Sequence, residues 1–511
     1  MTPNEKLAAA LETLRTLQER GQVAIPSADL TRSTREVLLK NQFLQPVIKG
    51  WYVASHPGER PGDTTSWYAA FWGFCRDYLE GRFGSDWILS AEQSLRLQAG
   101  DTVAPTQLLV RSPAANNQPT TFLHGTSLFE TKAVLPDAAD MVEWQGLRIY
   151  RPAAALILAQ AVFFEQNPLE ARTVLSTLGD ASELLTRLLA GGHSVVAGRL
   201  AGAFRNIGRD REAQDILETM RTAGYEVRET DPFRERARIP YQRDRSPYVH
   251  RIRTMWAQMR EAVIGRFPQP ASQVNDIDAY LAEVDGLYVT DAYHSLSIEG
   301  YTVSPELIER VRSGQWTPQA DPDDRRMEDA LAARGYWQAF QAVRESVREV
   351  VGGANPGAVA DRDHQRWYRE MFAPKIVAGL LRPENLAGYR NGPVYLKGSR
   401  HVPLNADAVR DAMPAFFTLL TEEPDPAVRI VLGHFIYVYI HPYFDGNGRT
   451  GRFLMNVMMA AGGYPWTVIP KQSRADYMAA LEAASTFGDI GPFTDFLAAH
   501  LGHAAITAAD P

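Results

Sequence analysis

The chain has 511 residues, of which 45% are hydrophobic and 22% charged, with a formal net charge of −7. This length predicts two to four domains, and the acidic balance excludes a global electrostatic attraction to nucleic acid or anionic lipid. The single cysteine, Cys75, excludes intramolecular disulfides and argues against a cysteine-based zinc site. Because the N-terminus lacks a signal-peptide pattern and no apolar run reaches the roughly 18 residues of a membrane span, we expect a cytoplasmic protein without membrane contact.

The first 56 residues have the pattern of a winged helix, in which helices precede a β-hairpin. Two amphipathic segments, "EKLAAALETLRTLQERG" and "STREVLLKNQFL", are followed by two short extended arms around Lys49 and Gly50. Residues 1–60 contain eight basic and six acidic side chains, so their charge does not decide between DNA binding and protein docking. Both functions stay open for this segment.

The rest of the chain predicts a multidomain, mainly α-helical protein. Residues 57–165 alternate helical and strand-like segments, as in a small α+β domain, and residues 166–228 are helical. Residues 229–248 are charge-dense and contain three prolines, which favours a linker or a wrapping arm. Residues 249–508 are helical apart from 388–404, where a turn at Lys397 and Gly398 between two extended arms predicts an embedded β-hairpin.

A loop with the sequence "HPYFDGNGRTGR" (441–452) joins two of the predicted helices. The apolar run 428–440 favours a buried helix, and Pro442 ends it because a proline disfavours helical geometry in the residue before it. Downstream, "RTGRFLMNVMMAAGG" predicts a second helix that ends at Gly462 and Gly463. The loop therefore runs into a helix N-terminus.

This arrangement favours a phosphate site. Gly446 and Gly448 allow close approach of the backbone, whose successive N–H groups form an anion-binding concavity next to the positive end of the helix dipole. Arg449 and Arg452 are three residues apart, so both guanidinium groups leave the first helical turn from neighbouring points and suit several phosphates in a row.

The remaining polar residues of the loop add catalytic chemistry to this phosphate site. Asp445 is interpreted as a ligand of a Mg²⁺ ion that bridges it to phosphate oxygens. Asn447 is expected to donate to a phosphate oxygen, and His441 is the natural general base for an incoming hydroxyl. The alternative is a capped helix with a satisfied histidine; the whole set at this spacing argues against it.

The motif resembles the signature of the Fic family, commonly written H-P-F-x-D/E-G-N-G-R-x-x-R, with Tyr443 in place of the usual Phe. The resemblance implies an all-α fold with a β-hairpin flap, and transfer of AMP from ATP to a Tyr, Thr or Ser hydroxyl of a target protein. It implies that His441 deprotonates the hydroxyl and that Asp445 holds Mg²⁺ on the α- and β-phosphates. Gly446, Asn447 and Gly448 would cradle the phosphates, and Arg449 and Arg452 would hold the β- and γ-phosphates. A glycine at 448, where the phosphorylating branch tends to carry Lys, favours AMP transfer.

Two further segments match the family outside the motif. The hairpin at 388–404 resembles the flap that clamps a target by strand addition, which would place Gly398 and His401 near the nucleotide. The segment 473–485 resembles the family's closing helix, with Tyr477 either beside the base or simply packed in the core. His434 is interpreted as a core histidine with no functional role.

The stretch "SLSIEG" (295–300) resembles the family's inhibitory motif, S/T-x-x-x-E-G/N. Ser295 and Glu299 are four residues apart, so they share one face of a predicted helix near 291–300. The resemblance implies that Glu299 pairs with Arg452 and blocks the γ-phosphate position. A carboxylate on that guanidinium competes directly with a phosphate for the same donors, so the sequence predicts an autoinhibited enzyme.

The N-terminal half has a weaker resemblance to the antitoxin component of AbiE-type abortive-infection systems, which implies DNA binding, autoregulation or partner recognition. An alternative to the AMP-transferring enzyme is therefore a transcriptional regulator whose Fic domain senses ATP. The presence of His441 argues for catalysis, because a pure sensor needs no base. Self-modification, removal of AMP from a target with Glu299 positioning water, and homodimer formation stay open.

Overall fold

The computed structural model describes residues 2–57, 64–234, 246–270, 276–316 and 324–501. The chain divides into two compact units, one made of residues 1–251 with 395–402 and one made of residues 252–394 with 403–511. Among the helices in the described ranges, none has the length together with the apolar composition that a transmembrane span requires.

The first unit begins with two helices and a small antiparallel sheet. Its elements are α1 (Pro3–Glu19), β1 (Ile25–Pro26), α2 (Arg32–Lys40), β2 (Leu44–Ile48) and β3 (Trp51–Ala54), with sheet order β1-β3-β2. Thr2 caps α1 by accepting from the Glu5 backbone N–H, while the Glu5 side chain accepts from the Thr2 N–H. The helices and the hairpin around Lys49 and Gly50 are as predicted; a winged helix remains the interpretation of this arrangement.

A mixed α/β region follows in the same unit. It consists of α3 (Thr65–Phe83), β4 (Ile88–Leu89), α4 (Ala91–Gln98), β5 (Gln107–Ser112), β6 (Pro119–Thr121), β7 (Ser127–Lys132), β8 (Met141–Trp144) and β9 (Leu147–Tyr150). The four-stranded sheet has the order β4-β5-β7-β6, with β5 and β7 parallel, and β8 pairs with β9. The aromatic side chains of Trp67, Phe74 and Phe122 pack edge to face in its core. The strand-like segments predicted within 57–165 are strands.

Helices complete the first unit, as predicted for residues 166–228. They are α5 (Pro152–Leu158), α6 (Ala161–Gln166), α7 (Pro168–Thr177), α8 (Ser182–Gly191), α9 (Ser194–Asn206) and α10 (Asp210–Thr222). Residues 235–245 of the predicted linker lie outside the described residues. The division between the two units falls inside the next helix, α11 (Pro247–Ile264).

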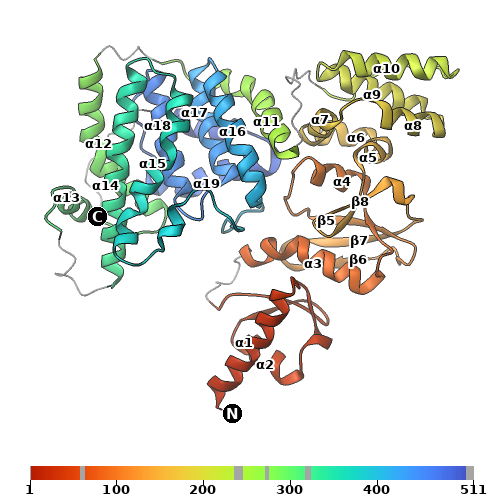
Figure 1. Ribbon diagram of the computed structural model, residues 1–511, viewed down its shortest axis with the longest axis horizontal. Coiled ribbons are helices and arrows are strands. Elements are labelled where there is room, and N and C mark those ends of the chain that lie inside the picture. Colours follow the sequence, from red (N-terminus) through yellow and green to blue (C-terminus); the bar gives the residue numbers. More distant parts are fainter. Residues whose placement is uncertain (1, 58–63, 235–245, 271–275, 317–323, 502–511) are drawn as a thin grey trace. The chain divides into compact units, whose positions relative to one another are not determined.

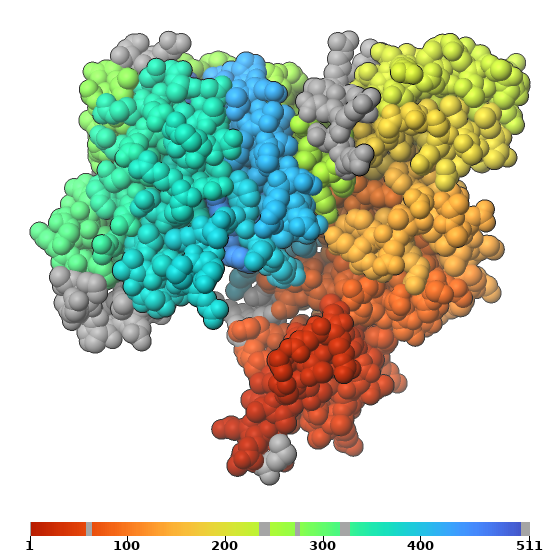
Figure 2. Space-filling model, in the orientation of Figure 1, coloured from red at the N-terminus to blue at the C-terminus, as the bar shows by residue number. Residues whose placement is uncertain are grey.

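The second unit is a helical bundle that contains the 441–452 loop. After α11 it comprises α12 (Ile277–Ile298), α13 (Pro305–Arg312), α14 (Asp324–Val351), α15 (Pro356–Val377), α16 (Ala406–Glu422), α17 (Pro426–Ile440), α18 (Asn447–Ala461), α19 (Arg474–Phe487) and α20 (Gly491–His500). Helices α14, α15, α17 and α18 pack side by side (Figure 1). In the space-filling view, α14, α15 and α16 cover much of the visible face of this unit in turquoise and blue (Figure 2).

The central helices of this bundle form where the sequence predicts them. The apolar run 428–440 lies in α17, most of whose side chains are buried. Asp425 caps α17 by accepting from the Val428 N–H, and Pro426 occupies the first turn, where its missing N–H costs nothing. Helix α18 begins at Asn447 and ends before Gly462, so the 441–446 loop connects two buried helices.

The predicted β-hairpin at 388–404 is not formed. Residues 391–405 contain no strand, and only the turn is present, with Ser399 N donating to Leu396 O over 3.2 Å. Pro393 and Pro403 lie in the two arms, and each removes a backbone donor that a strand ladder would use. The segment therefore consists of a turn between two arms that do not pair with each other as strands.

Candidate active site

The loop between α17 and α18 has an unusual backbone at both ends. His441 follows the last residue of α17 with φ 55° and ψ 64°, in the left-handed region that is uncommon for residues other than glycine. Gly446 precedes α18 with φ 80°, and a Cβ there would lie 2.7 Å from Phe372 Cε2. These two left-handed residues turn the chain sharply, so the loop delivers its side chains and backbone N–H groups to the start of α18.

The His441 side chain is held in one tautomer. Its Nδ1 lies 3.2 Å from Val438 O, and because a carbonyl oxygen only accepts hydrogen bonds, Nδ1 carries the proton and Nε2 keeps its lone pair. Desolvation lowers the pKa of His441 to about 4, and the positive charge of Arg390 acts in the same direction. The imidazole is therefore neutral at physiological pH, as a general base must be.

Asp445 and Arg449 form an ion pair at the mouth of the loop. Arg449 Nη2 lies 3.0 Å from Asp445 Oδ1, which also accepts from the Gly446 N–H over 2.6 Å. Desolvation raises the pKa of Asp445, but the Arg449 charge and hydrogen bond, the Gly446 N–H and the Lys375 charge together outweigh it, so the pKa lies below its usual value. The carboxylate side chain is 56% exposed, and its Oδ2 has no hydrogen bond to any residue in the described ranges.

This environment of Asp445 fits a magnesium ion that arrives with its nucleotide. Mg²⁺ is commonly bound by one or two carboxylates together with substrate phosphates rather than by a cage of protein ligands. In the part of the chain that the structure describes, no cluster of three His, Cys, Asp or Glu side chains could hold a metal by itself. Asp445 is thus the protein ligand that this loop offers.

The two loop arginines carry buried N–H groups without partners. Arg449 and Arg452 are 1% and 3% exposed, yet Arg449 Nε and Arg452 Nη1 have no hydrogen-bond partner among the described residues. A buried donor without an acceptor is costly, so these atoms are suited to bind an anionic ligand. They belong to the first two turns of α18, near the helix N-terminus, where the helix dipole also favours an anion.

The Asn447 side chain makes two hydrogen bonds to the backbone of Tyr443. Its Oδ1 accepts from the Tyr443 N–H over 2.9 Å, and its Nδ2 donates to Tyr443 O over 2.8 Å. The amide oxygen and one of the two amide N–H groups thus fix the loop, and the hydrogen bond from Asn447 to a phosphate oxygen remains a prediction. Asn447 can contribute to an anion site through its backbone N–H at the start of α18.

The predicted inhibitory residues lie against Arg452. Helix α12 ends at Ile298, and Glu299 is its C-cap. Arg452 Nη2 donates to Glu299 Oε1 over 2.7 Å and to Ser295 O over 3.0 Å, while Arg452 Nε donates to Ser295 Oγ over 2.9 Å. The guanidinium fork that would bind a phosphate is thus occupied by the end of α12.

Gly448 leaves room for this contact. A Cβ at position 448 would collide with Glu299 Oε1 and would lie 3.2 Å from Arg452 Nη1. The glycine that was predicted to admit a phosphate therefore also admits the Glu299 carboxylate. The two anions compete for the same space as well as for the same donors.

Further buried polar contacts hold α12 in place. Asp291 and Ser295 precede Glu299 at intervals of four residues, so the three side chains share one helix face. Tyr336, on α14, donates from its hydroxyl to Asp291 Oδ2 over 2.7 Å. Arg474 Nε donates to Ile298 O over 2.8 Å at the end of the helix. The position of Glu299 thus depends on contacts along the last two turns of α12.

Asp291 makes the stability of this region depend on pH. Its side chain is 4% exposed, and desolvation raises its pKa to about 6. The folded state therefore retains a proton on Asp291 that the unfolded chain releases near pH 4. Because of this proton, the free energy of unfolding of the wild type falls as the pH rises from about 4 to 6. Asp291→Asn cannot ionise, and it should stabilise the protein more at pH 8 than at pH 5, by about 1–2 kcal/mol.

Denaturant unfolding at the two pH values measures this difference. Asp278→Asn, at an exposed position on the same helix, is the matched control and should give no comparable difference. An effect of Asp291→Asn that is equal at pH 5 and pH 8 would contradict the assignment of a retained proton to Asp291.

Tyr477 is part of the core. It is 1% exposed, its hydroxyl lies 2.6 Å from His434 Nε2, and its ring packs against Phe493 and Phe496. The structure therefore favours the packed-tyrosine alternative over a contact with the nucleotide base. His434 is fully buried, as expected for a core histidine, and its bond to Tyr477 links α17 to α19.

Gly398 and His401 belong to residues 395–402, which group with the first unit. Gly398 lies in the turn with φ 75°, and His401 is buried. Their predicted place near the nucleotide remains a prediction.

Sequence reasoning missed the surroundings of Arg449. Its guanidinium lies 5.3 Å from the ring centre of Tyr301 and 5.2 Å from that of Phe372, and Lys375 Nζ donates to the Tyr301 hydroxyl over 3.1 Å. Tyr301 directly follows the "EG" of the inhibitory motif, so its position in the sequence was the available signal. Lys375 lies within α15, and nothing in its local sequence distinguishes it.

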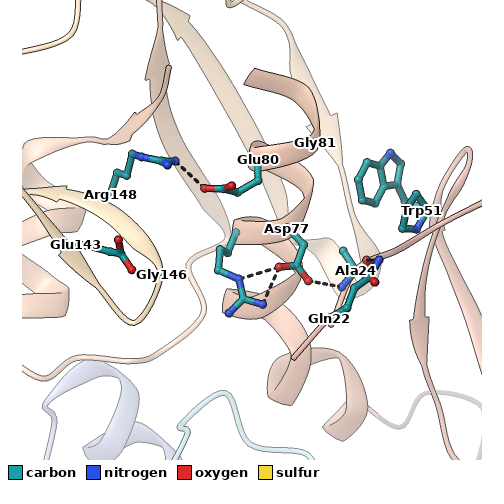
Figure 3. A pocket seen from close by; sticks show the side chains of 11 residues that line it. Gln22, Ala24, Trp51, Asp77, Glu80, Gly81, Glu143, Gly146 and Arg148 are labelled. Atoms are coloured by element: carbon teal, nitrogen blue, oxygen red, sulfur yellow. Dashed lines mark hydrogen bonds and ion pairs between the residues drawn. The ribbon is translucent and has the colours of Figure 1, made fainter. Parts of the chain in front are cut away.

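A cavity of about 500 Å³ lies in the first unit, lined by Trp51, Asp77, Glu80 and Arg148 among others (Figure 3). Arg148 pairs with Glu80, and Asp77 accepts from the backbone N–H groups of Val23 and Ala24. Each of these three charged side chains therefore has an ion-pair or hydrogen-bond partner within the protein. The cavity therefore lacks the unpartnered donors that distinguish the 441–452 loop.

Comparison with known proteins agrees with this geometry. Residues 362–459, from within α15 to near the end of α18, match the model of the Fic/DOC family. This part of the chain is similar to Fic domains. The match includes the whole 441–452 loop, whereas Ser295 and Glu299 lie outside it.

Two curated relatives illustrate the extent of the similarity. The protein adenylyltransferase Fic of Drosophila willistoni is 31% identical over 215 residues, which cover 41% of this chain and 39% of that protein. The protein of the same name from Drosophila melanogaster is also 31% identical over 215 residues, covering 40% of its length. The chain thus spans about two fifths of the length of these relatives.

Solved structures of Fic proteins also match. A fragment of Fic-1 from C. elegans has 19% sequence identity and a TM-score of 0.36, covering 66% of this chain and 95% of that one. A Fic domain containing signaling protein from Bacteroides thetaiotaomicron has 16% identity and a TM-score of 0.32, covering 48% and 93%.

Proposed function

We propose that this protein transfers AMP from ATP to a Tyr, Thr or Ser hydroxyl of a target protein, and that Glu299 restrains the transfer. The observation that carries the proposal is the pair of buried guanidinium groups with unpartnered N–H atoms beside His441 and Asp445. The protein adenylyltransferase name of relatives that match over the Fic region supports the same chemistry.

The reaction assigns one task to each group of the loop. Nε2 of His441 takes the proton of the target hydroxyl, whose oxygen then attacks the α-phosphorus of ATP. The bond from the α-phosphorus to the oxygen that bridges it to the β-phosphate breaks, and pyrophosphate leaves. Arg449 and Arg452, with the N–H groups at the start of α18, hold the phosphates and stabilise the developing negative charge. A Mg²⁺ ion on Asp445 would supply further charge neutralisation to the phosphates.

The partners of the protein are part of this proposal. Residues 391–405 contain no strand, and an extended target segment would bind beside this segment by strand addition, as the resemblance of 388–404 to the family's flap implies. The first 56 residues would select a target or a DNA site, and the helix–hairpin arrangement suits either role. Homodimer formation stays open beside these partners.

The position of the label distinguishes AMP transfer from other reactions of ATP. With ATP labelled at the α-phosphate, Glu299→Gly protein and a host-cell lysate, we expect a labelled protein band that the lysate alone does not give; with ATP labelled at the γ-phosphate we expect no band beyond those of the lysate alone. A band only with the γ-label would replace the proposal with phosphorylation. Nucleotide binding without either band would favour the ATP-sensing regulator.

A pre-labelled target tests the reverse reaction. If the wild-type protein releases AMP from a labelled target faster than the Glu299→Gly variant does, the function is removal of AMP, with Glu299 positioning the water. A band at the mass of the protein itself would indicate self-modification.

A further inference from the structure

Arg390 is a buried arginine that contacts the backbone of the catalytic loop. It follows α15 in the chain, before the 392–404 segment, and is 1% exposed. Its Nε donates to His441 O over 2.7 Å, and its backbone N–H donates to Pro442 O over 2.9 Å. Arg390 therefore fixes the two successive peptide units His441–Pro442 and Pro442–Tyr443.

The same guanidinium also holds the two ends of the 392–404 segment. Its Nη1 donates to Gly392 O over 2.9 Å, and its Nη2 donates to Leu404 O. Three backbone carbonyls that are far apart in sequence thus converge on one side chain. A change in the segment at either end would be transmitted to His441 through this group.

Arg390 has a charge without a counter-ion. In the described ranges, no carboxylate lies within ion-pair distance of it, and its acceptors are backbone carbonyls. Burial lowers its pKa to about 10, which leaves it protonated at physiological pH. A buried cation without a carboxylate is costly, so a role in packing alone is an incomplete account of it.

The backbone of His441 has a left-handed conformation that the hydrogen bonds from Arg390 help to stabilise. The left-handed conformation at φ 55° is unfavourable for a residue other than glycine, and it persists only if the surroundings impose it. The bonds to His441 O and Pro442 O act on the two carbonyls next to this residue. They stabilise the orientation in which Nδ1 faces Val438 O and Nε2 keeps its lone pair.

We propose that Arg390 is a positioning residue for AMP transfer: its guanidinium holds His441 in the orientation and tautomer of a general base and ties that base to both ends of the 392–404 segment. This inference rests on the proposed function, but it makes a separate statement about the imidazole that can be measured without turnover.

The charge of Arg390 gives the proposal a signature that a purely structural role lacks. The charged groups that act on His441 are Arg390, Glu299 at the end of α12 and Asp445 in the loop. Arg390 lowers the pKa of the imidazole, whereas the two carboxylates raise it. Loss of the Arg390 charge should therefore raise this pKa by about one unit, and the pH below which kcat falls should move upward by the same amount.

The experiment compares Arg390→Met, which has neither charge nor donors, with Arg390→Lys, which keeps the charge, both in the Glu299→Gly background. Arg209→Met in the first unit is the matched control, because Arg209 is buried and donates to Leu175 O and Leu178 O. The readouts are kcat and KM for ATP across pH, and the titration of the His441 ring nitrogens by NMR with labelled histidine, assigned with His441→Asn.

For Arg390→Met we expect kcat to fall about 10- to 100-fold, the size of effect expected from a slightly misplaced base, with little change in KM. The titration of His441 should move upward by about one pH unit. Arg390→Lys should keep the His441 titration of the Glu299→Gly parent, and its kcat should lie between those of the parent and Arg390→Met. Arg209→Met should alter neither quantity.

An unchanged titration of His441 in Arg390→Met, or equal losses of kcat in Arg390→Met and Arg209→Met, would overturn the proposal. If Arg390→Met does not fold, Arg390→Lys decides: parental kcat overturns the proposal, and a lowered kcat with unchanged KM and melting temperature supports it. If no variant transfers AMP, the proposed function fails, while the NMR titration still tests the coupling of Arg390 to His441.

Discussion

Glu299→Gly is expected to raise the rate of AMP transfer about 10- to 100-fold, because a hydrogen bond to a charged group contributes about 1.5–3 kcal/mol and here opposes phosphate binding. Arg452 Nη2 lies 2.7 Å from Glu299 Oε1, so the substitution removes the carboxylate that competes with the γ-phosphate for this guanidinium. The end of α12 should survive, because Gly300 with φ 92° still provides the left-handed residue that terminates the helix. Transfer of the α-label from ATP under single-turnover conditions measures the change.

Two Glu→Gln variants on α12 show whether the charge of Glu299 or the size of its side chain restrains the transfer. Glu299→Gln keeps the size of the side chain but weakens its hold on Arg452, so its rate should lie between those of wild type and Glu299→Gly. Glu283→Gln, at an exposed position on the same helix, should leave the rate unchanged. Equal rates for wild type and Glu299→Gly would show that the contact with Arg452 does not limit transfer.

His441→Asn is expected to lower AMP transfer by about 10²- to 10⁴-fold, the usual contribution of a positioned general base. Asparagine adopts the left-handed backbone conformation more readily than most residues, so this variant removes the base and retains the turn into α18. Binding of ATP should persist, since Arg449 and Arg452 are untouched. Equilibrium dialysis with ATP and single-turnover kinetics in the Glu299→Gly background measure the two quantities.

His124→Asn is the matched control for this variant. His124 lies in the first unit and also has a positive φ, of 50°, so the same chemical change is made at the same kind of backbone position. It should leave transfer unchanged. A His441→Asn protein that transfers AMP at the rate of its parent would mean that another group accepts the proton of the hydroxyl.

Residues that act within one short stretch were accessible from the sequence. The periodicity of the flanking helices, Pro442 and the glycines place the 441–452 loop at a helix N-terminus, because helix boundaries depend largely on local backbone preferences. The resemblance of "SLSIEG" to an inhibitory motif added Glu299, and its contact with Arg452 is present although 153 residues separate them. The prediction of a hairpin at 388–404 was wrong because it relied on the turn at Lys397 and Gly398 and did not count the two backbone donors that Pro393 and Pro403 remove.

By itself, the sequence determined the chemistry available at the loop: a base, a carboxylate and two guanidinium groups at the start of α18. Only the tertiary structure decided which of these groups are free. It assigned the Asn447 amide to Tyr443, the Tyr477 hydroxyl to His434 and the Arg452 fork to α12, and it brought Arg390 to the carbonyl of His441. The physical reason is that the partner of a buried polar group is set by which segments pack together, and such contacts leave no periodic or local signal in the chain.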